Sequence, residues 1–131
     1  MKTLIVDDDF VCRLLLQELL KKYGACHIAV NGNETVEAVR MAKRTGEPYD
    51  LICLDIMMPE MDGHQALKEI RALHLTNGTI SHNCPRIVMT TAATDRVSVV
   101  TAMQAGCDHF LTKPIRKDKL LETLRTMALI A

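Results

Sequence analysis

The sequence predicts an α/β fold in which five parallel strands form a single sheet with helices on both faces. Short apolar runs, such as residues 51–54, show no alternation of polar and apolar positions, as expected for strands buried on both faces. These runs alternate with segments whose apolar residues recur with helical period. The connections between them are short, which favours strands joined through helices into one parallel sheet.

Five apolar runs are the predicted strands: residues 3–6, 26–30, 51–55, 86–91 and 109–112. The first is ended by three consecutive acids and the third by a lone acid. The fourth (RIVMTT) ends in two threonines, and the fifth runs directly into a Lys-Pro pair. Each strand therefore carries polar side chains at its carboxyl end, where ligands bind in open α/β sheets.

Five segments of helical period are the predicted helices: residues 10–23, 34–44, 64–73, 95–105 and 116–129. Gly24 and Gly106 follow the first and fourth helices and are typical stop signals. Asp9 is expected to cap the first helix and Asn33 the second, because short polar side chains accept hydrogen bonds from exposed backbone amides. Residues 75–85 are predicted to be a polar loop, either a solvated insertion or a partner contact.

Right-handed crossovers restrict such a chain to a doubly wound sheet, and the flavodoxin-like strand order 2-1-3-4-5 fits five strand–helix units. In this order the topological switch point lies between the first and third strands. The ends of these strands carry Asp7, Asp8 and Asp55, so three carboxylates from distant parts of the chain are expected to converge on one crevice.

Length, charge and cysteine content limit the number of domains, the binding partners and the cellular compartment. With 131 residues, the chain is expected to form one domain, residues 1–131, with no output domain after the last helix. Sixteen basic and sixteen acidic side chains cancel, which argues against binding to nucleic acid or to a membrane surface. Five cysteines without a C-x-x-C pair suggest reduced thiols, and no apolar run approaches the ~18 residues of a membrane span. We therefore expect a cytoplasmic protein.

The residues at the switch point suit phosphoryl chemistry. Carboxylates in one crevice repel one another unless a cation lies between them, and hard oxygen ligands favour magnesium over zinc. An aspartate can be the nucleophile that accepts a phosphoryl group. The charge on the transferred oxygens then needs a cation and a hydrogen-bond donor, which Lys113 and Thr91 supply from the ends of the fifth and fourth strands.

Five motifs give the chain a specific resemblance. They are VDD at residues 6–8, LDIMMPEMDG at 54–63, TTA at 90–92, AG at 105–106 and KP at 113–114. In this order the chain resembles, over essentially its whole length, the receiver domain of two-component response regulators. It is most similar to the stand-alone type, such as the chemotaxis response regulator. The resemblance implies a protein that receives a phosphoryl group from the phosphohistidine of a histidine kinase, with Mg²⁺ as cofactor.

The resemblance also implies a metal and acceptor site. Asp55 resembles the phosphoacceptor. Asp7 and Asp8 resemble the acidic pair that binds Mg²⁺ directly or through water, and the backbone carbonyl of Met57 would complete the metal site together with Asp55.

A second set of residues resembles the conformational switch of the family. Thr91 corresponds to the hydroxyl that reorients onto the phosphoryl group, and Lys113 to the lysine that pairs with that group. Phe110 corresponds to the aromatic residue that turns inward when the hydroxyl moves. Pro59 and Gly63 are expected to shape the loop and the helix start after the acceptor.

Two positions depart from fast-dephosphorylating relatives, which often carry polar residues two positions after the acceptor and after the switch hydroxyl. Met57 and Ala93 occupy these positions here, and neither side chain can orient an attacking water. We therefore expect a signalling protein, not an enzyme, with slow self-dephosphorylation.

The implied partners are a sensor histidine kinase or phosphotransfer protein and a downstream protein target. The target would bind the surface formed by the fourth helix, fifth strand and fifth helix. Phe10, Val11 and Leu14 on the first helix form either a kinase-docking patch or ordinary packing. The protein is expected to be a monomer or a phosphorylation-dependent dimer.

Three other functions have to be weighed against these residues. A phosphorelay intermediate that passes its phosphoryl group onward fits the same site. A phosphatase of the haloacid dehalogenase type needs a second acid two residues after the nucleophile, where this chain has Met57. A nucleotide or flavin binder needs a glycine cluster that the sequence lacks.

Overall fold

The computed structural model describes residues 1–58, 61–81, 83–92 and 96–131. The expectations for Pro59 and Ala93 therefore fall outside the described residues. The strands are β1 (Thr3–Val6), β2 (Cys26–Ala29), β3 (Leu51–Asp55), β4 (Leu75–Thr76), β5 (Thr79–Ile80), β6 (Arg86–Ala92) and β7 (His109–Lys113). The helices are α1 (Phe10–Leu20), the 3-10 turn η1 (Lys21–Tyr23), α2 (Gly32–Arg44), α3 (Gly63–Leu73), α4 (Arg96–Gln104) and α5 (Lys117–Thr126).

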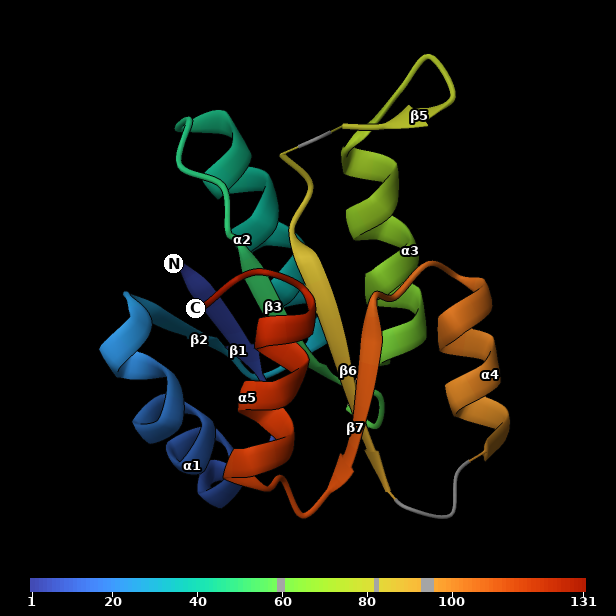
Figure 1. The fold of residues 1–131 in the computed structure, drawn as a ribbon. Helices are drawn as coiled ribbons and strands as arrows, with labels where there is room; N and C mark the ends of the chain where they lie inside the picture. Colours follow the sequence, from blue (N-terminus) through green and yellow to red (C-terminus); the bar gives the residue numbers. More distant parts are fainter. Residues whose placement is uncertain (59–60, 82, 93–95) are drawn as a thin grey trace.

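The main sheet has the predicted topology. Its strand order is β2-β1-β3-β6-β7, and every neighbouring pair is parallel (Figure 1). Because β4 and β5 form a separate two-stranded sheet, this is the order 2-1-3-4-5 when only the strands of the main sheet are counted. The flavodoxin-like prediction is confirmed.

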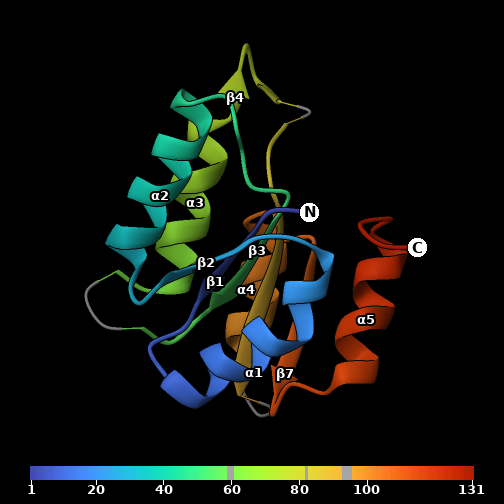
Figure 2. The same ribbon diagram turned by 90° about the vertical axis from the view of Figure 1, so that its left-hand side faces the viewer.

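Helices cover both faces of the sheet, α1 and α5 on one and α2, α3 and α4 on the other (Figure 2). Side chains alternate between the faces along each strand, so each face has its own apolar core. The α1/α5 face buries Ile5, Leu51, Cys53 and Val88 against Leu16, Leu20, Leu120 and Leu124. The α2/α3/α4 face buries Leu4, Ile52, Ile87 and Met89 against Val39, Ala66, Leu67, Ile70 and Ala102.

The prediction of a loop at residues 75–85 is wrong in part, because this segment contains a β-hairpin. Leu75 pairs with Ile80 and Thr76 with Thr79 in an antiparallel ladder. The two residues between the strands, Asn77 and Gly78, have φ values of 52° and 79°. Asn-Gly with two positive φ angles is the preferred sequence of a two-residue hairpin turn. The signal was present in the sequence, but strands of two residues are too short to show a pattern.

The predicted helix caps are partly confirmed. Asp9 caps α1, as expected, by accepting a hydrogen bond from the Val11 amide at 3.0 Å. The prediction of Asn33 as the cap of α2 is wrong. Asn31 is the cap, and it accepts a hydrogen bond from the amide of Glu34 at 2.8 Å. The side chain of Glu34 in turn accepts from the backbone amide of residue 30, which is a reciprocal capping arrangement.

Gly63 is the glycine that matters most for the site. A Cβ atom at this position would lie 2.4 Å from the backbone oxygen of Asp55 and 2.8 Å from the Cα of Ile56. The Gly63 amide also donates a hydrogen bond to the Ile56 carbonyl at 2.9 Å. The first turn of α3 therefore packs directly on the backbone that ends β3.

Every helix in the described part of the chain is too short or too polar to cross a lipid bilayer.

Candidate functional site

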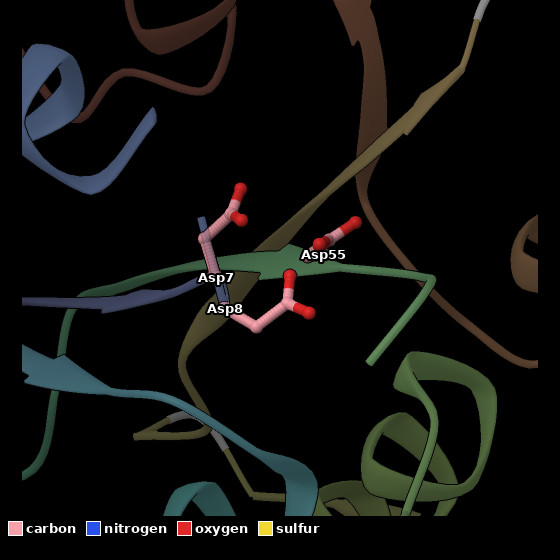
Figure 3. Close-up of side chains that lie close together, drawn as sticks. All are labelled: Asp7, Asp8 and Asp55. Atoms are coloured by element: carbon pink, nitrogen blue, oxygen red, sulfur yellow. The ribbon is translucent and has the colours of Figure 1, made fainter. Parts of the chain in front are cut away.

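The carboxyl ends of β1 and β3 bring three carboxylates together, as the topology predicts. Asp7 and Asp8 directly follow β1, and Asp55 is the last residue of β3. One carboxylate oxygen of each lies within 4.8 Å of one of each of the others (Figure 3). Asp7 and Asp55 are buried, whereas Asp8 is exposed. The cluster therefore opens to solvent on the side of Asp8.

Lys113, at the end of β7, joins this cluster. Its Nζ lies 2.9 Å from Oδ2 of Asp7 and 3.3 Å from Oδ2 of Asp55. Because β6 lies between β7 and β3, the lysine side chain must cross over β6 to reach these carboxylates. The lysine thus links the edge of the sheet to the switch point at its centre.

The charges in the cluster shift one another's pKa values. Burial and the negative charge of Asp7 raise the pKa of Asp55 to about 6, although Lys113 acts in the opposite direction. Burial would also raise the pKa of Asp7, but hydrogen bonds from Cys12, the Asp9 amide and Lys113 outweigh it and lower this pKa. Burial lowers the pKa of Lys113, but the two carboxylates more than compensate and raise it. Of the two buried carboxylates, Asp55 is thus the one whose negative charge is less well stabilised in the metal-free protein.

Two contacts to Asp7 were not predicted from the sequence. The Asp9 amide donates a hydrogen bond to Oδ1 of Asp7 at 2.9 Å, and the Cys12 side chain also helps to lower the pKa of this carboxylate. Cys12 is a free, half-buried cysteine. Burial and its contact with Asp7 raise the pKa of Cys12 to about 12, so the thiol is protonated near neutral pH. Its position in the first turn of α1, soon after the acids that end β1, is the signal that the sequence offers.

The backbone after β3 supports Asp55. The Met57 amide donates a hydrogen bond to Oδ1 of Asp55 at 3.3 Å. The Met57 side chain is 70% exposed and apolar, so it offers no polar atom to a water beside Asp55. The Met57 carbonyl remains an expected metal ligand.

Thr91 and Phe110 lie on the same face of the sheet. Thr91 follows Ile87 and Met89 at two-residue intervals on β6, and these residues belong to the core of the α2/α3/α4 face. Phe110 on β7 is the register partner of Met89. Thr91 is buried, whereas the Phe110 side chain is 41% exposed. In this structure, the aromatic ring is therefore in an outward position.

The cluster fits a hard divalent cation. All three acids offer oxygen ligands, the set that Mg²⁺ prefers, and its open side leaves room for water and phosphate oxygens. Lys113 already balances part of the negative charge, which would otherwise make a buried acidic pair unstable.

Fold and site together define a member of a known family. The family model described as "Response regulator receiver domain" matches residues 3–125. The chain therefore belongs to the response regulator receiver domain family, and its function is that of a phosphoacceptor in two-component signalling.

Individual relatives agree. The chain is 36% identical over 125 residues to the chemotaxis protein CheY of Bacillus subtilis. This alignment covers 94% of this chain and 93% of the relative. It is 34% identical over 128 residues to the sensory/regulatory protein RpfC of Xanthomonas campestris, but it spans only 16% of that protein's length. Similar sequences thus occur both as small proteins and as parts of much larger ones.

Solved structures show the same fold. The receiver domain of the Saccharomyces cerevisiae response regulator Ssk1, crystallised with the histidine phosphotransfer protein Ypd1, has a TM-score of 0.81 and 27% identity. That comparison covers 99% of this chain and 92% of the other. The receiver domain of the histidine kinase PA1611 from Pseudomonas aeruginosa, with magnesium coordinated in its active site cleft, has a TM-score of 0.77 and 24% identity. It covers 97% of each chain.

Proposed function

We propose that Asp55 is the residue that accepts the phosphoryl group. The observation that carries this proposal is the position of its carboxylate at the end of β3, within 4.8 Å of the oxygens of Asp7 and Asp8 and 3.3 Å from Lys113 Nζ. A nucleophile, an acidic cation site and a fixed positive charge are thus assembled in one place. Phosphoryl transfer depends mainly on such positioning and charge stabilisation.

The transfer itself requires few groups. A carboxylate oxygen of Asp55 attacks the phosphorus of a phosphohistidine, the new O–P bond forms as the N–P bond breaks, and the imidazole leaves. Mg²⁺ bound by Asp7, Asp8, Asp55 and the Met57 carbonyl would neutralise charge on the phosphoryl oxygens. Lys113 needs little movement to pair with the same oxygens, since it already contacts Asp55.

The response to phosphorylation would pass through Thr91 and Phe110. Thr91 would turn toward the phosphoryl group, and Phe110 would then move from its exposed position toward the sheet. The two side chains lie on the same face of adjacent strands, so a movement of one side chain can change the packing of the other. Phosphorylation adds about 1.5 to 2 negative charges, enough to bias such a two-state element.

Two apolar surfaces suit the expected partners. Phe10, Val11 and Leu14 on α1 are 65%, 70% and 47% exposed, beside the carboxylates, where a histidine kinase or phosphotransfer protein would dock. Val97 and Met103 on α4 and Phe110 on β7 are also exposed, on the surface expected to bind the downstream target. The second candidate, a phosphorelay intermediate, is favoured by the likeness to the Ssk1 receiver that was crystallised with a phosphotransfer protein.

Met57 supports a long-lived phosphorylated state. Its exposed side chain has no group that could orient a water for attack on the phosphoryl group. We therefore infer slow self-dephosphorylation, for which an aspartyl-phosphate lifetime of only seconds in the isolated protein would be contrary evidence.

Intact mass after incubation with acetyl phosphate and Mg²⁺ tests the proposal. The wild-type protein should gain the mass of one phosphoryl group, and Asp55→Asn should gain none. Omitting Mg²⁺ should abolish the gain in wild type. Equal labelling of both proteins, or of neither, would contradict the assignment of Asp55.

A further inference from the structure

We propose that the hydroxyl of Thr90 is a positioning group for Lys113 during phosphoryl transfer, an inference that rests on the proposed function of Asp55. Thr90 precedes Thr91 on β6, so its side chain faces the opposite side of the sheet. The side chain is 1% exposed, and its Oγ1 has no hydrogen-bond partner among the described residues. A buried hydroxyl without a partner destabilises the resting protein, so its presence needs an explanation.

The register places Thr90 beside the charged cluster. Thr90 is the partner of Asp55 between β6 and β3, and both lie on the α1/α5 face, in line with Val88 and Cys53. Lys113 lies on the same face of β7, because Leu111 two residues earlier packs against that core. To reach Asp55, the lysine side chain must cross β6 on this face. The Thr90 hydroxyl therefore lies next to the path of the lysine.

The hydrogen-bonding capacity of Lys113 fits this arrangement. An ammonium group has three donors, and Asp7 and Asp55 are the two carboxylates that it contacts. When the phosphoryl group arrives, the ammonium turns from the Asp55 carboxylate to the phosphoryl oxygens. The Thr90 hydroxyl oxygen then accepts one of its N–H groups and holds it on the β6 side of the site. A hydrogen bond made only during transfer raises the rate without stabilising the resting protein.

Substitutions at Thr90 separate the hydroxyl from the volume of the side chain. Thr90→Val keeps the shape and removes the hydroxyl, and Thr90→Ser keeps the hydroxyl. With acetyl phosphate and Mg²⁺, we expect Thr90→Val to be phosphorylated about tenfold more slowly than wild type, the factor for one hydrogen bond to a charged group. Thr90→Ser should stay within about threefold of wild type.

A double-mutant cycle tests whether the effect passes through the lysine. In a Lys113→Gln background, Thr90→Val should cause no further loss of rate, because the group that it positions is absent. A merely structural effect would reduce the rate by the same factor in both backgrounds.

Thr3 provides a matched control. It is also 1% exposed, and its Oγ1 also has no partner among the described residues, but it begins β1 and so lies at the end of the sheet away from the carboxylates. In chemical denaturation of the metal-free proteins, Thr3→Val and Thr90→Val should both be more stable than wild type. Only Thr90→Val should be phosphorylated more slowly.

Three results would overturn the inference: an unchanged rate in Thr90→Val, the same loss in the Lys113→Gln background, or a lower stability of Thr90→Val, which would mean that the hydroxyl is already bonded at rest. All three leave the role of Asp55 intact. That role fails separately, if wild type gains no phosphoryl mass or if Asp55→Asn gains it.

Discussion

Asp55 combines two properties that oppose each other in a resting protein. As the proposed acceptor, it must be close to other acids to share a cation, and it must be ionised to attack phosphorus. Burial and the charge of Asp7 raise its pKa to about 6, so its ionised form is destabilised until a cation binds. Asp55 therefore gives the metal-free protein a pH-dependent stability.

This dependence should be measurable by comparing wild type with Asp55→Asn in EDTA. The pKa of Asp55 is higher in the folded protein, about 6, than the ordinary value of 3.8, so folding is penalised above pH 6 and the penalty disappears as the pH falls toward 4. Asn carries no charge and removes the penalty. Asp55→Asn should thus be more stable than wild type at pH 7 to 8, by at most about 3 kcal/mol, with little difference near pH 4.

Urea denaturation between pH 4 and 8 measures this difference, and Mg²⁺ should reduce it. A stability difference that does not change across this range would show that Asp55 titrates normally in the folded protein.

Lys113 should stabilise the metal-free site more than an ordinary surface lysine does. Lys113→Gln leaves two buried carboxylates without their cation, and we expect a loss of about 1–3 kcal/mol in the free energy of unfolding in EDTA. Mg²⁺ should restore part of this loss. Lys21→Gln is the control, since Lys21 and Glu18 form an exposed pair that should contribute less than about 1 kcal/mol. Equal effects of the two substitutions would contradict the role assigned to Lys113.

At the residue scale, the sequence predicted which acids meet, because the strand ends and the strand order follow from apolar patterns. It could not predict that Lys113 contacts Asp7 more closely than Asp55, 2.9 Å against 3.3 Å. Nor could it predict that Cys12 helps to lower the pKa of Asp7. Both depend on the reach of side chains across neighbouring elements, which local patterns do not encode.

At the element scale, the contact between the start of α3 and the end of β3 fixes the backbone of Asp55, the proposed acceptor. Replacing glycine by alanine within a helix normally stabilises the helix by roughly 1 kcal/mol. At Gly63, however, a Cβ would lie 2.4 Å from the Asp55 carbonyl oxygen, so the backbone must move. Gly63→Ala should therefore lose about 2 kcal/mol of stability and also be phosphorylated more slowly.

Lys68→Ala, at an exposed position of the same helix, should change neither property. Thermal denaturation and the acetyl phosphate assay measure both effects. A stable and fully active Gly63→Ala variant would show that the contact between α3 and β3 can relax without cost.

The elements themselves differ in how well they could be predicted. Long segments with a strong period, such as α2, are predictable from the sequence. The cap of α2 is not, since Asn31 caps the helix and not Asn33 as predicted. Both asparagines flank Gly32, and only the backbone conformation distinguishes them. The last helix ends at Thr126, earlier than the predicted residue 129. Two residues further on, Ala128 has a φ of 59°, which is not helical. Short elements and helix ends depend on single residues, which carry little pattern.

At the scale of the whole molecule, the carboxylates and the β4–β5 hairpin lie at opposite ends of the sheet. Asp55 lies at the carboxyl end of β3, and α3 then runs back along the sheet, so the β4–β5 hairpin lies at the opposite end (Figure 1). Leu75 and Ile80, paired across the hairpin, are 52% and 43% exposed. Changes in the hairpin should therefore leave the acceptor chemistry intact.

Gly78→Ala tests this separation. Gly78 has a φ of 79° and open space around it, so alanine would strain the turn without a clash. We expect a loss of about 1 kcal/mol or less, because a two-stranded hairpin can open while the main sheet stays folded. Amide hydrogen exchange should rise at residues 75–80, and the rate of phosphorylation by acetyl phosphate should equal that of wild type. A slower rate would mean that the hairpin is coupled through α3 to Gly63 and the Asp55 backbone, so that the two ends of the sheet respond together.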